Sequence, residues 1–507
     1  MKRSLFTFHF SLLTLHFSLF TLHFFVAVLL FFGLAYPHHL HYQEQYQLFL
    51  FDSNYVWEIV RLPGGVADLL GRFCTQFFLF AWVGALIIAI LLSAVRLLTR
   101  LPMILSLVPA FLLWLFLLDE NALLGGVWAV LLTLLAAWAF DKIPSGWMRY
   151  ILLLIAVPAV YWMVGPVCVV FFLLQAQREG KAIAFLAVLA LMPIILACFL
   201  PVHTGSLWYG IHYHRYPTEI PVLLWAAALS VFVLSLTVRI FRTGRRVCDI
   251  TRPVSRLLTP VSCLLCLLCG LCAVWKTSNF KAEKVMGYDF MARHQQWNRI
   301  LETINAEKPN NQIGVTVQNL ALGMHGLLID HLFDYNQNGL LGLLPDVGTD
   351  AVSPLPTAEA FYQLGMINIA HRTVFEAQEA ILDFQKSGRC YKRLAQTNLI
   401  NGSYEVARKY LSALQKTLFY KEWADETLPL LGDEEAIAKH PEYGRLRRMT
   451  YDKDFYFGDH VTPEMLEDLC LKNEDNRLAY QYLVAYYMLT GDRDGYTNFL
   501  RKTSTKQ

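Results

Sequence analysis

The sequence predicts an all-α protein, with a polytopic α-helical membrane domain over residues 1–276 and a soluble, tetratricopeptide-like helical domain over residues 277–507. Composition supports the membrane part, because 55% of all residues are hydrophobic and only 16% are charged, whereas a soluble globular chain carries about 25% charged residues. The deficit is confined to residues 1–276, which hold 18 Lys+Arg and 10 Asp+Glu, against 25 and 30 in residues 277–507. The first part is therefore suited to lipid and the second to water.

Long apolar runs recur through the first domain. A transmembrane helix needs about 20 mostly apolar residues, and backbone in lipid must satisfy its own hydrogen bonds, so each such run is predicted to be a helix. The predicted spans are residues 20–36, 77–95, 101–118, 122–140, 182–200, 220–238 and 257–275. The stretch 148–177 is interrupted by Gly165-Pro166 and predicts either two short spans or a re-entrant hairpin. The domain then has about nine crossings, or seven and a hairpin.

Basic residues predict the sidedness of these spans, because Lys and Arg remain on the cytoplasmic side of a membrane. Lys2 and Arg3 place the N-terminus in the cytoplasm. Every later basic cluster, including the arginine-rich loop 239–256, falls on the same side if 148–177 returns the chain to the side it left. The helical domain 277–507 is therefore expected outside the cytoplasm. The excess of Lys and Arg in residues 1–276 is explained by the orientation of the spans in the membrane, so no nucleic-acid partner is expected.

After Lys276 the apolar residues are spaced by three and four, as in amphipathic helices. Three stretches resemble degenerate tetratricopeptide repeats, in which small residues let paired helices approach each other. In one copy Phe361, Leu364 and Gly365 match the Trp-x2-Leu-Gly opening, and in the other two Gly402 and Gly491 lie where the turn between the paired helices is expected. The spacing between the copies is irregular, so a non-repeat helical bundle is the alternative.

Three carboxylates in the long first outer loop, residues 37–76, are the catalytic candidates: Glu44, Asp52 and Glu58. A base that activates an acceptor, or an acid-bound cation that holds a lipid phosphate, would be expected at this membrane–water boundary. The alternative is that these are solvated side chains of an amphipathic segment on the membrane surface.

Two groups of residues are candidate metal ligands, so a divalent cation is the cofactor class considered. His38 and His41 fall in the first outer loop, and His212 and His214 fall in the third, on the same predicted face. Histidines are also common among interfacial aromatic residues, which is the alternative for all four.

The second group, Asp334, Asn336 and Asn338, matches the opening of a calcium-binding loop. Pro345 stands where that loop needs a bidentate Glu, so an Asx-rich turn is the alternative.

Several motifs that would indicate soluble-enzyme chemistry are absent from the sequence. There is no Walker lysine motif, G-x-S-x-G, H-E-x-x-H or G-x-G-x-x-G. ATP hydrolysis, zinc peptidase action and Rossmann cofactor binding are disfavoured accordingly. A transporter is also disfavoured, because the predicted spans contain almost no ionisable residues.

Three segments carry a resemblance to a known family: QEQYQLFLFDSNYVWEIVRLPGG, NLALGMHGLLIDHLFDYNQNGLLGLLP and SGRCYKRLAQTNLINGSYEVARKYL. They resemble an uncharacterised family of bacterial multi-spanning inner-membrane proteins, a domain of unknown function, over nearly the whole chain after the first 24 residues. The resemblance implies a multi-pass protein of the bacterial inner (cytoplasmic) membrane. It implies no activity and no site residues.

The layout also resembles that of C-superfamily glycosyltransferases, which are polytopic, use lipid-linked sugars and carry a catalytic acid in a long first outer loop. This chain departs from them, because its first-loop acids are isolated and its adjacent pair, Asp119-Glu120, lies in the second outer loop. We therefore expect a membrane protein that binds or assembles an envelope protein or peptide through its helical domain. The alternative is a glycosyltransferase that takes a lipid-linked sugar at the outer face.

Overall fold

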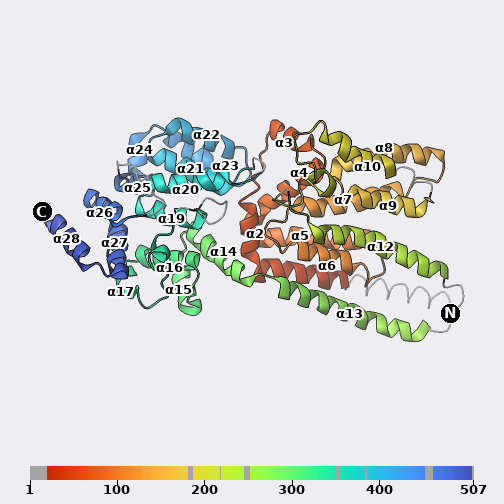
Figure 1. Ribbon diagram of the computed structural model, residues 1–507, viewed down its shortest axis with the longest axis horizontal. Helices are drawn as coiled ribbons and strands as arrows, with labels where there is room; N and C mark the ends of the chain where they lie inside the picture. The colour runs from red at the N-terminus through yellow and green to blue at the C-terminus, as the bar shows by residue number, and fades with distance from the viewer. Residues whose placement is uncertain are drawn as a thin grey trace. The chain divides into compact units, whose positions relative to one another are not determined.

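The computed structural model is built from α-helices, as the sequence predicts (Figure 1). It describes residues 20–180, 186–216, 218–244, 252–346, 348, 354–382, 385–451 and 461–504. Within these ranges there is no β-strand, and the one isolated bridge joins Ala122 to His214. The basic residues Lys2 and Arg3 and the loop 245–251 lie outside the described residues.

The chain forms two compact units. The first consists of Met1–Glu44 and Asp52–Phe280, and the second of Gln45–Phe51 and Lys281–Gln507. The sequence placed the boundary after Lys276 and assigned residues 45–51 to the membrane domain. In the structure this short segment of the first outer loop packs within the second unit.

The first unit begins with a helix over Phe20–Ala35 that ends in a π-turn. The helices that follow are α2 (Pro37–Glu44), α3 (Ser53–Val60), α4 (Gly65–Thr75), α5 (Ala81–Leu98), α6 (Leu107–Phe116), α7 (Leu124–Phe140), α8 (Trp147–Val164), α9 (Cys168–Arg178), α10 (Leu186–Ala197), α11 (Ser206–Tyr209), α12 (Val222–Gly244) and α13 (Arg252–Thr277).

Three of these helices are long and apolar enough to cross a membrane: Ala81–Leu98, Trp147–Val164 and Val222–Phe241. The count reaches five if each of two bent helix pairs, Phe20–Ala35 with Pro37–Glu44 and Val261–Thr277 with Phe280–Arg293, is one span. The sequence predicted about nine. Several of the other predicted spans are shorter helices; α6, for example, has 10 residues, or about 15 Å at the helical rise.

The predicted interruption of 148–177 occurs at Gly165, which has a φ of +77° between α8 and α9. The helix α8 is 18 residues long and α9 has 11, so the two parts are unequal rather than matched halves. A Cβ on Gly165 would lie 2.9 Å from the Tyr213 hydroxyl. The hydroxyl also donates a hydrogen bond to the Val164 carbonyl, which ties the third outer loop to the break.

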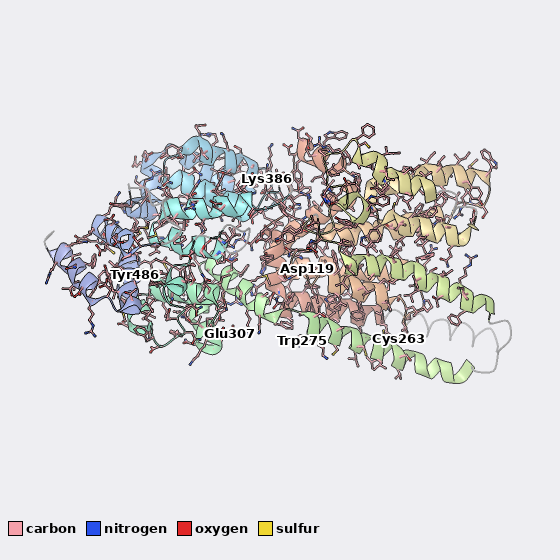
Figure 2. All side chains as sticks on the ribbon, viewed as in Figure 1. Asp119, Cys263, Trp275, Glu307, Lys386 and Tyr486 are labelled. Carbon is pink, nitrogen blue, oxygen red and sulfur yellow. The ribbon has the colours of Figure 1, made fainter. Side chains whose placement is uncertain are left out.

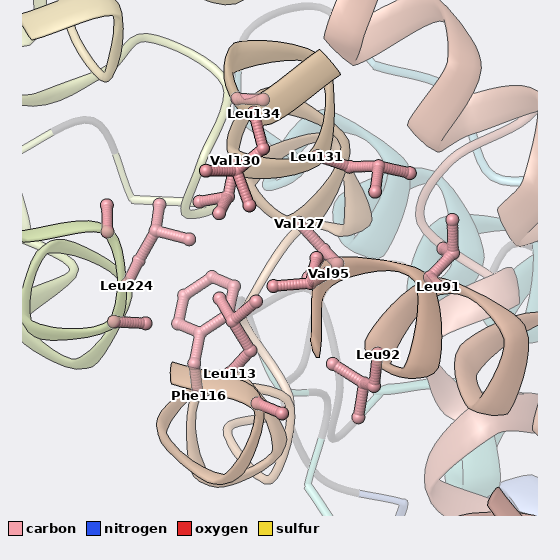
Figure 3. Packing of buried hydrophobic residues seen from close by; sticks show 14 of the residues in the cluster. Leu91, Leu92, Val95, Leu113, Phe116, Val127, Val130, Leu131, Leu134 and Leu224 are labelled. Atoms are coloured by element: carbon pink, nitrogen blue, oxygen red, sulfur yellow. The ribbon is translucent and has the colours of Figure 1, made fainter. Parts of the chain in front are cut away.

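The core of the first unit lies between α5, α6, α7 and α12, where leucine, valine and phenylalanine side chains interdigitate (Figure 3). The helices α4 and α7 approach each other closely. A Cβ on Gly71 would lie 2.4 Å from the backbone nitrogen of Gly125. Small residues at such crossings let helix backbones pack without intervening side chains.

The second unit contains the remaining helices. They are α14 (Phe280–Arg293), α15 (Trp297–Glu307), α16 (Gln312–Met324), α17 (Leu328–His331), α18 (Leu340–Leu343), α19 (Pro354–Leu364), α20 (Ile367–Glu379), α21 (Gly388–Ile400), α22 (Tyr404–Leu414), α23 (Lys421–Thr427), α24 (Glu434–Lys439), α25 (Tyr443–Met449), α26 (Pro463–Lys472), α27 (Arg477–Thr490) and α28 (Arg493–Ser504).

Each of the three repeat-like stretches forms two consecutive helices joined at a glycine. Gly365, Gly402 and Gly491 all have a positive φ, of +89°, +78° and +70°, at the turn between the paired helices. Glycine adopts this left-handed conformation without the steric cost that other residues carry. The pairs α19–α20 and α21–α22 pack against one another in series, and identification of these pairs as tetratricopeptide repeats stays a prediction.

Candidate functional site

The three predicted catalytic carboxylates have separate surroundings. Glu44 is buried at the end of α2. Asp52 caps the N-terminus of α3 by accepting hydrogen bonds from the backbone of Asn54 and Tyr55. Glu58 is exposed on α3 and pairs with Arg61, one turn away. Asp52 and Glu58 therefore have separate local structural partners.

The loop that contains Asp119 and the loop that contains His214 meet at one end of the first unit. The Leu123 and Arg215 backbone N–H groups donate to the carbonyls of Tyr213 and Asn121. This pairing brings His214 Nε2 to 3.2 Å from Asp119 Oδ2, and Asp119 is labelled in Figure 2. Burial raises the pKa of Asp119, but hydrogen bonds from His214 and from the Asn121 N–H outweigh it and leave the pKa lowered.

A buried ionic cluster lies near this loop pair. Asp68 Oδ2 accepts a hydrogen bond of 2.9 Å from Arg72 Nε, one turn further along α4. The same oxygen is 3.5 Å from His212 Nδ1, and Arg72 also bonds the Tyr55 side chain. All of Asp68, Arg72 and His212 are buried. A buried carboxylate requires such partners, since an uncompensated charge in low dielectric is costly.

The four histidines considered as metal ligands do not converge on one point. His38 and His41 lie within one turn of α2, with their Nδ1 atoms 3.4 Å apart. His212 contacts Asp68 and His214 contacts Asp119 instead. Among the residues that the structure describes, no group of three or more His, Cys, Asp or Glu side chains could hold a metal ion. We therefore do not propose the shared histidine site.

The predicted calcium-loop residues hold a turn in place. The side-chain amides of Asn336 and Asn338 donate to backbone carbonyls of residues 308–310. Asp334 accepts a 2.7 Å hydrogen bond from His331 Nδ1. These three side chains therefore have different partners, which agrees with the alternative of an Asx-rich turn.

A buried polar network of the second unit is centred on Arg389, near the N-terminus of α21. Its guanidinium makes two parallel hydrogen bonds, of 2.6 and 2.8 Å, to the carboxylate of Asp289. It also donates to the Leu355 carbonyl and lies 3.5 Å from Glu359. Burial lowers the pKa of Arg389, but Asp289 and Glu359 outweigh it and raise the pKa overall, so this guanidinium is charged in the interior.

A second arginine extends the network by one helical turn. Arg393 donates a 2.6 Å hydrogen bond to Glu359 and lies 3.6 Å from the centre of the Tyr362 ring. The Tyr362 hydroxyl in turn donates to Glu442. Each charge thus has at least one opposite partner, as buried charges need.

The segment Gln45–Phe51 binds directly to this network. Gln45 Oε1 accepts a 3.0 Å hydrogen bond from Arg389. The Leu48 N–H donates to the carbonyl of Lys386 (Figure 2), and the Phe51 N–H donates to that of Lys416. These contacts run from the start of α21 to the turn after α22. Residues 45–50 are all buried, although the segment contains neither helix nor strand from residue 47 onward.

Neither the network around Arg389 nor the segment Gln45–Phe51 that binds to it was predicted from the sequence. One available signal was the pair Arg389 and Arg393, spaced by four within a stretch that predicts a helix. Such spacing puts both side chains on one helix face, where Glu359 from α19 could meet them. The position of Gln45 carried no local signal, since its partner lies 344 residues away.

Comparison with known proteins supports the expected resemblance. A model of a family of unknown function (DUF6057) matches residues 11–507. No curated protein and no solved structure gives a significant match to the chain. Since the matched region covers nearly all of the 507 residues, the chain belongs to this family of unknown function.

Proposed function

We propose that this chain is a multi-spanning cell-envelope protein whose helical unit, outside the cytoplasm, binds a non-helical peptide segment and assembles with partners through it. The observation that carries the proposal is the burial of residues 45–50 within the second unit, fixed by Arg389 and by backbone hydrogen bonds. In this arrangement the first outer loop is the resident ligand of the helical unit.

The contacts have the features of peptide recognition. Backbone hydrogen bonds, here from Leu48 and Phe51, contribute affinity without regard to side-chain identity. The contact between Gln45 and Arg389 adds selectivity, because a buried charged donor that loses its acceptor is costly. Support for the glycosyltransferase alternative is lacking, since Asp52 caps a helix and Glu58 forms a surface ion pair.

A peptide-binding measurement on the full-length protein tests the proposal. The double substitution Leu48→Asp and Leu50→Asp should expel the resident segment, because a charged side chain is strongly disfavoured in an apolar site. A fluorescent peptide of residues 43–53 should then bind the purified variant, read by fluorescence anisotropy. It should bind the unaltered protein much more weakly, because the tethered segment occupies the same positions.

Two peptides serve as controls. A scrambled peptide of the same composition should not bind, and a peptide with Gln45→Leu should bind about tenfold more weakly, as expected for a lost hydrogen bond to a charged donor. Circular dichroism should show equal helix content in the variant and the unaltered protein. Equal binding of the native peptide to both proteins, or of the scrambled and native peptides to the variant, would contradict the proposal.

A further inference from the structure

A cavity of about 380 Å³ opens between four helices of the first unit. It is lined by the C-terminal end of α5 and the residues that follow it, the C-terminal parts of α7 and α9, and the second half of α12. The helices α7, α9 and α12 lie side by side in Figure 1 and pack against one another. The volume falls within the range of about 300–1,000 Å³ typical of small-molecule sites.

The cavity has apolar walls and a charged rim. Leu101, Leu134 and Ala137 are buried in its walls, and Leu174 and Val231 complete them. The charged residues that line it are Arg100, Asp141, Arg178 and Arg239. The side chains of Arg100 and Arg178 are about half exposed, at 51% and 47%, so they stand at the opening. This is the layout of a site for an amphiphile with an anionic head.

The charges at the rim are not balanced within the described residues. The carboxylate of Asp141 is shared among three guanidinium groups, at 3.1 Å from Arg100, 2.9 Å from Arg178 and 4.0 Å from Arg149. The one further carboxylate here, Glu179, pairs with Arg149 at 3.2 Å. Three guanidinium groups thus meet two carboxylates, and Arg239, whose guanidinium donates to the Gln177 carbonyl, lines the same cavity. One bound phosphate group would reduce this excess.

An exposed aromatic side chain at the cavity distinguishes a lipid from a soluble anion. Trp138, which lines the cavity, is 39% exposed. Trp138 also lies under the ammonium of Lys142, 3.4 Å from the ring centre, an arrangement suited to the membrane–water interface. Acyl chains would cover this surface, whereas a soluble phosphate would leave it bare.

We propose that this cavity binds an anionic phospholipid, with the phosphate held by Arg100, Arg178 and Arg239 and the acyl chains packed along α7 and α12. Basic pockets between transmembrane helices on the cytoplasmic side are suited to anionic headgroups. The site is distinct from the peptide segment of the second unit. The two proposals are therefore independent, and each is tested by its own experiment.

Native mass spectrometry of the full-length protein in detergent, titrated with phosphatidylglycerol or phosphatidylcholine, tests the proposal. The unaltered protein should retain phosphatidylglycerol preferentially. Arg178→Gln and Arg239→Gln should each weaken that binding about fivefold, the effect expected for one basic residue near an anionic lipid. Ser235→Trp, which fills the cavity from a half-buried position without changing charge, should weaken it as well.

Arg61→Gln is the matched control, because Arg61 is equally exposed, at 53%, but pairs with Glu58 on α3 and does not line the cavity. It should leave phosphatidylglycerol binding unchanged. Unaltered binding in both the Arg178→Gln/Arg239→Gln double variant and Ser235→Trp would overturn the proposal. So would displacement of the lipid by glycerol phosphate at equal concentration, since that result identifies a soluble-anion site.

Discussion

At the scale of single residues, the second unit is marked by charges kept in its interior. Lys392 on α21 is only partly exposed, and its ammonium lies 4.9 Å from the centre of the Trp423 ring. Burial, together with the charges of Arg293 and Arg393, lowers its pKa from 10.5 to about 8. The folded protein therefore releases this proton well before the unfolded chain does.

This difference predicts a pH dependence of stability. Between pH 8 and 10.5 the unfolded chain holds more of the Lys392 proton than the folded one, so the contribution of Lys392 to stability rises with pH across that window. The thermal midpoint of the unaltered protein should therefore increase relative to that of Lys392→Met as the pH is raised from 7.5 to about 9.5. Differential scanning fluorimetry at a series of pH values measures the difference.

Lys409→Met is the matched control, because Lys409 is exposed on the neighbouring helix α22. Its midpoint should follow that of the unaltered protein at every pH. A difference between the unaltered protein and Lys392→Met that stays constant with pH would contradict the shifted titration of Lys392.

The sequence drew attention to polar residues of the loops, but it did not show which partner each side chain has. Asp52 was a catalytic candidate, but it directly precedes an apolar helical run, and an Asp at such a position is a recognised helix N-cap signal. The outer histidines were expected to be near one another in two loops, yet His212 and His214 contact different acids. Neighbours in sequence point to different sides of a loop, so composition alone does not determine which side chains meet.

At the scale of helices, the α4–α7 crossing depends on two glycines. Gly71→Ala would place a Cβ 2.4 Å from the Gly125 backbone nitrogen, so the helices must separate. We expect a loss of about 1–3 kcal/mol of stability, as for other overpacked interiors. The readouts are a lower thermal midpoint in detergent and a lower yield of folded protein. Gly180→Ala, where nothing lies within 4 Å of the added Cβ, should change neither.

Most helix positions followed from the sequence because hydrophobic periodicity and glycine turns are local signals. The break at Gly165 and the turns at Gly402 and Gly491 occur where they were expected, and Gly365 forms a further turn that was not predicted. Helix lengths were less accessible: the apolar run 101–118 contains a helix only from Leu107, since residues 101–106 form turns. An apolar composition favours burial, but it does not by itself distinguish a turn packed in the core from a helix.

At the scale of the whole molecule, the arginines bear on sidedness. Arg100, Arg149, Arg178 and Arg239 come from different parts of the sequence, yet all lie around one cavity or its rim. The loop pair of Asp119 and His214 lies by the start of α7, whereas the cavity lies by its end. These four arginines therefore lie at one end of the first unit, and the positive-inside rule predicts that this end faces the cytoplasm.

Reporter fusions test the resulting topology. Alkaline phosphatase fused after Gln507 should be active, because the helical unit is expected outside the cytoplasm, where this enzyme matures. A fusion truncated after Ser145, in the loop between α7 and α8, should be inactive, and green fluorescent protein at the same two positions should give the opposite pattern. Phosphatase activity only at Ser145 would reverse the predicted orientation.

Charge and hydropathy predicted two domains, but they gave no indication that Gln45–Phe51 belongs to the second unit. That segment lies in a loop whose aromatic residues suited a membrane surface equally well. Only its pairing with a buried arginine far along the chain decides between the two environments.

Gln45–Phe51 is covalently joined to α2 at one end and to α3 at the other. These connections determine how readily a competing ligand can replace the segment. A segment joined by short connections returns to its binding position as if present at a local concentration of the order of millimolar. A competitor of merely micromolar strength would need to accumulate to far above its own dissociation constant before it displaced the segment. A force applied along α2 or α3 would instead pull the segment out of its binding position directly. Mechanical force and a competing ligand are therefore two separate ways to free the binding position of the helical unit.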